Sequence, residues 1–240
     1  MRLSKKDFKM ENGCLVYSDE VDVQGDLIIE EDLGLVFFQK LVKASGNIIA
    51  KTGSGIKAGW SIEAGEGIEA GWGIKAGWSI EAGEGIKAGW SIEAGEGIEA
   101  GWGIKAGGSI EAGEGIKAGG SIEASGSIEA GWSIKAGWSI EASGSIEAGR
   151  GIKAGGSIKA GGSIKAGWGI KAGGSIEAGW GIKAGGSIEA DEGIISFYGP
   201  ISAKQISCLR LAAGFNSKIE QEINAKTIKG KVLLGKVKSK

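Results

Sequence analysis

Isoleucine recurs at every sixth residue from Ile56 to Ile194, and this fixed interval constrains the fold more than any other feature of the chain. The interval holds for 24 consecutive isoleucines, and alanine follows two residues after each of them except the last. The unit reads, with few exceptions, Gly, a variable residue, Ser or Gly, Ile, Glu or Lys, Ala. Self-similarity at a fixed short period is the signature of a repeat architecture.

An amphipathic helix does not fit this interval. A helical stripe needs apolar residues at spacings of three and four, whereas a six-residue spacing moves successive isoleucines around the helix axis. Glycine in almost every unit would also cost a helix roughly 1 kcal/mol each time. A strand fits better, because apolar and polar residues alternate within Ser-Ile-Glu-Ala and the Ile and Ala then share one side. Glycine in the following Gly-X pair supplies the corner, since it tolerates backbone angles closed to other residues.

The strands are predicted to be parallel. Two-residue hairpins would need dipeptides such as Asn-Gly or Asp-Gly, which are absent from the repeats. Identical units stacked in register predict an all-β fold, a parallel β-solenoid with six-residue sides, whose turns bury Ile and Ala against one another. Three sides per turn are favoured, and two remain open, because Glu and Lys at lags of 12 and 18 residues show no excess of opposite charges. The pattern does not specify the handedness.

The repeat resembles the hexapeptide β-helices, three-sided prisms with one hexad per side. In the left-handed helix of acyltransferases a small residue stands two positions before the large aliphatic one, whereas here Ile precedes Ala. Residues 46–50 and 59–64, which read Gly-Asn-Ile-Ile-Ala and Gly-Trp-Ser-Ile-Glu-Ala, are similar to the rungs of the bactofilin-like, polymer-forming family. The resemblance covers about two-thirds of the chain. It implies a β-helix and, through the second family, self-assembly.

Three regions follow from the spacing. Residues 1–45 are predicted to form irregular first rungs and an N-terminal cap, with Leu15, Val21, Leu27 and Leu33 keeping a six-residue interval. Residues 46–195 form the regular solenoid, and residues 196–240 form late rungs and a C-terminal cap. The sequence Ser-Lys-Ile-Glu at 217–220 fits a helical capping box, so we expect a short helix in this cap. Residues 223–225 and 228–230 read equally well as late rungs.

A tandem copy shows that the hexads are interchangeable. Residues 59–88 and 89–118 are identical except that Trp78 is replaced by Gly108. The copied block is five hexads long, and five is a multiple of neither two nor three. The copied hexads therefore fall on different sides of the solenoid, so we expect no side to be specialised in this stretch.

Composition argues against most chemistry. The 28 basic and 29 acidic residues are interleaved, which disfavours a nucleic-acid partner. The run Lys153, Lys159, Lys165 and Lys171 is a local basic patch and is interpreted as a solvated strand face. The chain has no histidine, so neither acyltransferase chemistry nor a Ser-His-Asp or Cys-His arrangement is expected. No metal-ligand spacing appears. We expect no enzyme, no cofactor and no metal.

The lack of long apolar runs in the sequence bears on where the protein is located. No stretch of 18 apolar residues is present, so no transmembrane helix or membrane insertion is expected. The first residues lack the apolar core of a signal peptide, and two cysteines do not suggest a disulfide framework. Cys208 stands in the alanine slot, where we expect a buried small side chain. A cytoplasmic location is expected.

All the tryptophans of the chain occupy one slot, directly after the corner glycine. They are Trp60, Trp72, Trp78, Trp90, Trp102, Trp132, Trp138, Trp168 and Trp180. The same slot accepts Glu66, Gly108 and Arg150, so it cannot be a packed interior. One interpretation is that the indoles only cover the corner backbone. The other is that they form a contact surface, since exposed tryptophan is enriched at interfaces.

Two functions remain as hypotheses. The first is a non-enzymatic structural β-solenoid that self-associates or polymerises through its ends or its Trp-bearing corners. The alternative is a protein-binding module, such as an inhibitor or immunity-type protein, that presents a flat charged face to one specific partner.

Overall fold

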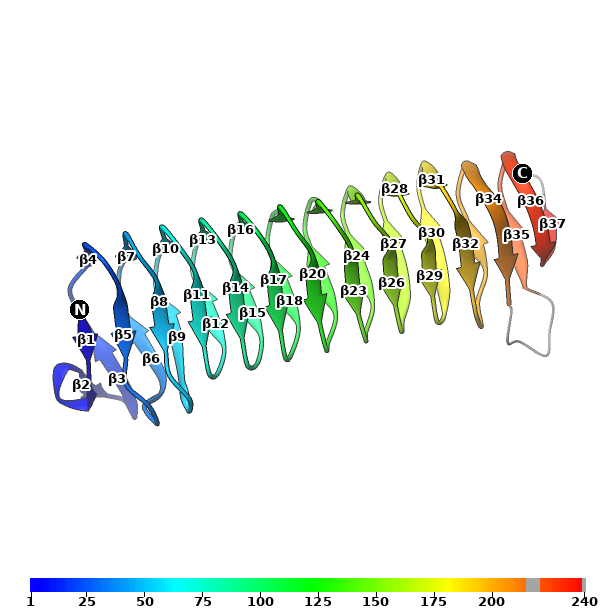
Figure 1. The fold of residues 1–240 in the computed structure, drawn as a ribbon. Helices are drawn as coiled ribbons and strands as arrows, with labels where there is room; N and C mark the ends of the chain where they lie inside the picture. Colours follow the sequence, from blue (N-terminus) through cyan, green and yellow to red (C-terminus); the bar gives the residue numbers. More distant parts are fainter. Residues whose placement is uncertain (215–220, 239–240) are drawn as a thin grey trace. The chain divides into compact units, whose positions relative to one another are not determined.

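The computed structural model describes residues 1–214 and 221–238, and short strands make up nearly all of its regular structure. The backbone divides into two compact units, residues 1–119 and 120–240. In each unit successive strands form the turns of a parallel β-solenoid, which the ribbon makes visible (Figure 1). Within the described ranges the one helical segment is the 3-10 turn η1 (Lys5–Asp7). The predicted all-β fold is confirmed.

The first unit contains nineteen strands. They are β1 (Arg2–Leu3), β2 (Lys9–Glu11), β3 (Cys14–Tyr17), β4 (Val21–Val23), β5 (Leu27–Ile29), β6 (Gly34–Phe38), β7 (Val42–Ala44), β8 (Ile48–Ala50), β9 (Ser54–Ala58), β10 (Ile62–Ala64), β11 (Ile68–Ala70), β12 (Ile74–Ala76), β13 (Ile80–Ala82), β14 (Ile86–Ala88), β15 (Ile92–Ala94), β16 (Ile98–Ala100), β17 (Ile104–Ala106), β18 (Ile110–Ala112) and β19 (Ile116–Ala118).

The strand register shows how many sides a turn has. Strand β10 pairs with β13, so that Ile62 lies opposite Ile80. The two strands that follow β10 pair in the same way with β14 and β15, again with isoleucine opposite isoleucine. Each strand therefore meets the strand three places on, 18 residues later, and a regular turn has three six-residue sides. The two-sided alternative does not apply.

The second unit repeats this arrangement. Its strands are β20 (Ile122–Ala124), β21 (Ile128–Ala130), β22 (Ile134–Ala136), β23 (Ile140–Ala142), β24 (Ile146–Ala148), β25 (Gly151–Ala154), β26 (Ile158–Ala160), β27 (Ser163–Ala166), β28 (Gly169–Ala172), β29 (Ile176–Ala178), β30 (Gly181–Ala184), β31 (Ser187–Ala190), β32 (Gly193–Ser196), β33 (Ile201–Ser202), β34 (Gln205–Ala213), β35 (Glu222–Asn224), β36 (Thr227–Leu234) and β37 (Lys236–Lys238). Strand β25 pairs with β28, with Ile152 opposite Ile170, so three sides per turn hold here too.

The core consists of the isoleucine and alanine side chains. Every isoleucine from Ile56 to Ile194 is buried, and so is each alanine of the repeats. Full burial of an isoleucine contributes roughly 1.5–3 kcal/mol before the entropy cost, so within each unit the stacked turns are stabilised by a shared apolar core. The outward residues of each strand are the glutamates and lysines, which are exposed or half-buried.

The repeat glycines have a different role from the one predicted. From Gly59 to Gly185 only Gly181 has a positive φ, of 151°, so unusual backbone angles do not explain the repeated glycine. The reason is close approach: a Cβ on Gly83 would lie 2.0 Å from the carbonyl oxygen of Gly65, one turn earlier. Glycine is favoured at this slot because successive turns stack backbone against backbone at the corner.

The N-terminal rungs are less regular than the array. Leu15, Val21 and Leu27 are buried, but Leu33 is only half-buried and lies outside the strands. The six-residue interval fails there because Asp32 and Gly34 adopt left-handed backbone angles, φ 57° and 68°, and turn the chain. The core position passes to Val36 in β6, which lies opposite Ile56.

An antiparallel strand and an aromatic cluster cover the first turn. Strand β2 pairs antiparallel with β3, unlike the other strand pairs of the first unit, which are parallel. Phe8 is buried directly after η1, and its ring meets those of Tyr17 and Phe38 edge-on, with centroids 6.0 and 5.9 Å away. An antiparallel terminal strand and buried rings limit the parallel edge that this end offers to another chain.

Toward the C-terminus the spacing changes but the stacking continues. Strand β35 pairs with β33, and β36 with β34, so residues 222–224 and 227–234 extend the parallel ladders. The helix expected at 217–220 lies outside the described residues. Cys208 is buried in β34, and desolvation raises the pKa of its thiol although backbone hydrogen bonds oppose the shift. No helix in the described part of the chain has the length and hydrophobicity needed to span a membrane.

Candidate contact surface

The tryptophans lie at the corners of the solenoid turns, and all nine are exposed, from 39% for Trp72 to 74% for Trp102. The backbone sets their positions, because the N–H of most of these tryptophans donates to a carbonyl one turn earlier. The N–H of Trp78 donates to the Trp60 carbonyl at 3.2 Å, and that of Trp102 to the Glu84 carbonyl at 3.0 Å. Corner side chains on successive turns are thereby aligned.

Some of these indoles stack on one another. The rings of Trp60 and Trp78 are 5.7 Å apart and 9° from parallel, and those of Trp72 and Trp90 are 5.5 Å apart and 12° from parallel. Their separations are slightly larger than the strand spacing of about 4.8 Å, as expected for rings carried by adjacent strands. These pairs are consistent with corner packing.

A cation–π ladder occupies one corner of the second unit. The Arg150 guanidinium lies 4.8 Å from the Trp132 ring centroid and 5.5 Å from that of Trp168. Further on, the ring of Trp180 meets that of Tyr198 at 5.7 Å with a tilt of 38°. Seven of the nine indoles thus have an aromatic or cationic partner within the chain.

Trp102 and Trp138 differ from the others. Neither makes a ring or cation contact with the described residues, and they are the most exposed indoles, at 74% and 71%. Trp138 follows Gly120 and precedes Gly156 along its corner, as the backbone hydrogen bonds between them show. With glycine on both sides, both faces of this indole are left free of a neighbouring corner side chain.

The outward glutamates and lysines form ion pairs between adjacent turns. Lys87 lies 2.8 Å from Glu69, and Lys171 lies 3.0 Å from Glu189. The hydrogen bond from Lys171 lowers the pKa of Glu189, and the same bond raises the pKa of Lys171. Such exposed pairs are each worth about 0–1 kcal/mol, so they contribute more to solubility and register than to stability.

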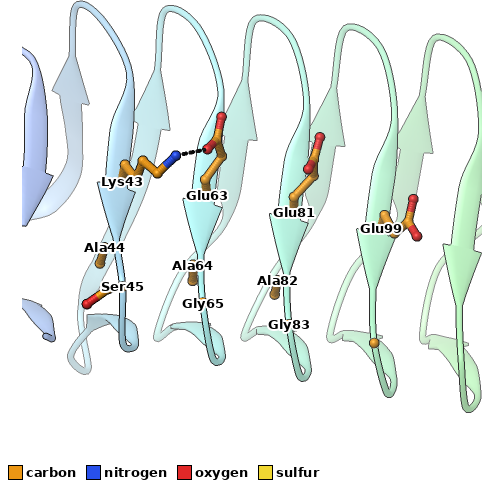
Figure 2. Close-up of a pocket in the computed structure, with 11 residues that line it drawn as sticks. Lys43, Ala44, Ser45, Glu63, Ala64, Gly65, Glu81, Ala82, Gly83 and Glu99 are labelled. Carbon is orange, nitrogen blue, oxygen red and sulfur yellow. Dashed lines mark ion pairs between the residues drawn. The ribbon is translucent and has the colours of Figure 1, made fainter. Parts of the chain in front are cut away.

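An acidic row runs along one side of the first unit. It consists of Glu63 on β10, Glu81 on β13 and Glu99 on β16, which lie opposite one another in the ladder. Figure 2 shows the three carboxylates on successive strands above a groove whose floor is alanine and glycine. Lys43 closes one end of the row through an ion pair of 3.0 Å with Glu63, which raises the pKa of Lys43.

A basic row runs along one side of the second unit. It consists of Lys135 on β22, Lys153 on β25 and Lys171 on β28. The patch predicted from Lys153, Lys159, Lys165 and Lys171 is therefore wrong. Lys159 and Lys165 lie on β26 and β27, which form the other two sides of the turn. One glutamate lies 3.9 Å from Lys159, and another lies 3.5 Å from Lys165. Sequence reasoning missed the row because it depends on the 18-residue turn.

No protein-family model, curated protein or solved structure matches this chain. Within the described ranges no three His, Cys, Asp or Glu side chains are grouped so as to hold a metal ion. The features that stand out from the repeat are therefore the tryptophan corners and the two charged rows.

Proposed function

We propose that this chain is a non-enzymatic, cytoplasmic structural β-solenoid that self-associates through its tryptophan corners. The observation that carries the proposal is the exposure of Trp102 and Trp138, which have no ring partner in the described structure. Burying an indole that exposes roughly 150–200 Å² would contribute about 4 kcal/mol before the entropy cost of association. The likeness of the repeat to the bactofilin-like, polymer-forming family also supports it.

Side-to-side association is favoured over association through the N-terminal end. The antiparallel β2 strand and the buried Phe8 cover the ladder of β3 and β6 at that end, whereas the corners carry exposed apolar surface on many turns. Exposed tryptophan is disfavoured on a monomer and enriched in the centres of interfaces.

Serine substitutions at the corners test the proposal. The double variant Trp102→Ser/Trp138→Ser is expected to reduce association without changing thermal stability, because neither ring packs on another. The matched variant Trp60→Ser/Trp78→Ser is expected to lose stability as well, since it removes a stacked pair worth about 0.5–1.5 kcal/mol. Light scattering from micromolar to millimolar concentration measures association, and circular dichroism measures melting.

The result separates this proposal from the alternative of a module that binds one different protein through a flat charged face. The groove along the acidic row is the feature that favours that alternative. A wild-type chain that stays monomeric over the whole concentration range would overturn self-association and leave the binding module as the better proposal.

A further inference from the structure

The fold gathers like charges on adjacent strands in both units. In the acidic row Glu81 lies directly opposite Glu63 and Glu99. In the basic row Lys153 lies directly opposite Lys135 and Lys171. Like charges that face each other across a ladder are destabilising, so these positions cost the isolated chain stability.

Within the chain, ion pairs neutralise only the two end residues of the acidic row. Glu63 pairs with Lys43, and Glu99 pairs with Lys117. Glu81 accepts a hydrogen bond of 3.1 Å from the Ser79 hydroxyl, but no ion pair to it occurs among the residues the structure describes. The middle of the acidic row therefore keeps an unmatched charge.

The basic row has even fewer ion pairs within the chain. Lys171 pairs with Glu189 at 3.0 Å. Lys135 and Lys153 have no ion pair within residues 1–214 and 221–238, and their outward positions leave both ammonium groups in solvent. A partner with a row of carboxylates at the strand spacing would match them.

We propose that the acidic row of one copy docks against the basic row of a second copy. The inference rests on the proposed self-association and adds to it a charged interface that fixes how two copies align. Each row holds three charges on consecutive turns. Because both are carried by parallel strands about 4.8 Å apart, their spacings are equal by construction, and three ion pairs can form at once.

The surface beside the acidic row suits lysine side chains. The groove is floored by Ala64, Ala82, Gly65 and Gly83, and its volume is about 600 Å³. Figure 2 shows this floor next to the carboxylates, with no bulky residue among those drawn between one glutamate and the next. Lysine stems from the second copy can lie over the small residues while their ammonium groups meet the carboxylates.

A second copy is the partner that the chain's own charges indicate. The two rows are opposite in sign, and the net charge of the chain is −1, so neither a polyanion nor a polycation would match both. Complementary rows of this kind set alignment and partner choice more than affinity.

Charge reversal with rescue tests the interface. One variant carries Glu63→Lys, Glu81→Lys and Glu99→Lys, and the other carries Lys135→Glu, Lys153→Glu and Lys171→Glu. Sedimentation equilibrium at low salt is expected to show self-association weaker by roughly tenfold or more for each variant alone. An equimolar mixture is expected to regain association, since each variant then offers the row that the other needs.

Matched controls carry the same charge changes elsewhere. They are Glu69→Lys, Glu93→Lys and Glu111→Lys on other sides of the first unit, and Lys159→Glu, Lys165→Glu and Lys183→Glu on other sides of the second unit. Both controls should associate like the wild type. If a reversed variant melts below its control, the neutral set Glu63→Gln, Glu81→Gln and Glu99→Gln replaces it, with weaker association again expected.

The outcomes distinguish this inference from the proposed function. If the wild type associates and the reversed variants associate equally well, or if mixing them restores nothing, the charged interface is wrong while self-association through the tryptophan corners stands. If the wild type is monomeric throughout, both are overturned.

Discussion

The first glycine of each repeat lies against the backbone of the preceding turn, so an added methyl group has no free space. At Gly83 a Cβ would approach the Gly65 carbonyl oxygen to 2.0 Å, and a side-chain rotation cannot relieve that contact. Where serine occupies this slot, at Ser125 and Ser143, the next residue is glycine. Asp191, followed by Glu192, also occupies this slot near the end of the regular array, so a Cβ is accepted at a few corners.

Substitution of Gly83 tests this steric account. We expect Gly83→Ser to lower the free energy of unfolding by about 1–3 kcal/mol, as overpacking does. The double change Gly83→Ser/Glu84→Gly, which recreates the Ser-Gly corner, should recover part of the loss. Urea unfolding followed by tryptophan fluorescence gives the values.

The control for this substitution lies two residues further on. A Cβ on Gly85 would be 3.5 Å from the Gly103 carbonyl oxygen, an ordinary contact, so Gly85→Ser should change the free energy of unfolding by less than about 0.5 kcal/mol. Equal losses at Gly83 and Gly85 would contradict the steric explanation.

At the residue scale the sequence predicted which way a side chain points better than it predicted the physical reason for a residue. Ile56 and its equivalents point inward because they alternate with charged residues, and Trp102 points outward because its slot also accepts Glu and Gly. From the sequence, the glycine at positions such as Gly83 is explained by its tolerance of unusual backbone angles, and this explanation is wrong. Contact between backbones of different turns cannot be derived before the number of sides is known.

At the scale of the strand, the sequence predicted one strand per hexad, four residues long over Ser-Ile-Glu-Ala, whereas most repeat strands span only Ile to Ala; it left the number of sides open. Every hexad carries the same isoleucine, so apolar spacing fits turns of 12 or 18 residues equally well. The charges do not help, because 18-residue neighbours include both the pair Lys87 and Glu69 and the like pair Glu63 and Glu81. Exposed ion pairs are too weak to impose a pattern on the sequence.

A single substitution tests the corner ladder in which Arg150 contacts the rings of Trp132 and Trp168. Replacing Arg150 with Gln keeps a long polar side chain but removes the cation, and each exposed cation–π contact is worth about 0.5–1 kcal/mol. We expect Arg150→Gln to lower the unfolding free energy by about 1–2 kcal/mol, whereas Arg150→Lys should lose less. Thermal melting measures both, and an unchanged melting temperature in Arg150→Gln would show that the ladder does not stabilise the corner.

At the scale of the whole molecule, identical sequences acquire different surroundings. Glu63 and Glu93 occupy equivalent positions of the tandem copy, yet Glu63 belongs to the acidic row on β10, and Glu93 lies on β15 beside Lys75, 2.5 Å from its ammonium group. The copy shifts each hexad to another side of the turn. The charged rows therefore arise from the 18-residue turn together with the order of the hexads, which is why the repeat alone did not reveal them.

The charges also predict how stability depends on pH. The chain has no histidine. Hydrogen bonds from Asn47 lower the pKa of Asp26, and those from Lys171 and Lys238 lower the pKa of Glu189 and Glu222. Hydrogen bonds to glutamate raise the pKa of Lys43 and of Lys171.

The direction of each shift gives the sign of the effect. Below the ordinary carboxyl pKa the unfolded chain binds more protons than the folded one, so the free energy of unfolding falls as the pH drops through the lowered pKa values of these carboxyls, below about pH 4. The raised lysine pKa values stabilise the fold until the pH passes above about 10, where this contribution is lost. Between about pH 6 and 8 we expect a plateau, measured by urea unfolding at each pH. A change in the free energy of unfolding within that pH range would contradict this prediction, because it would require a buried titrating group. The charged side chains of the described residues all lie on outward positions.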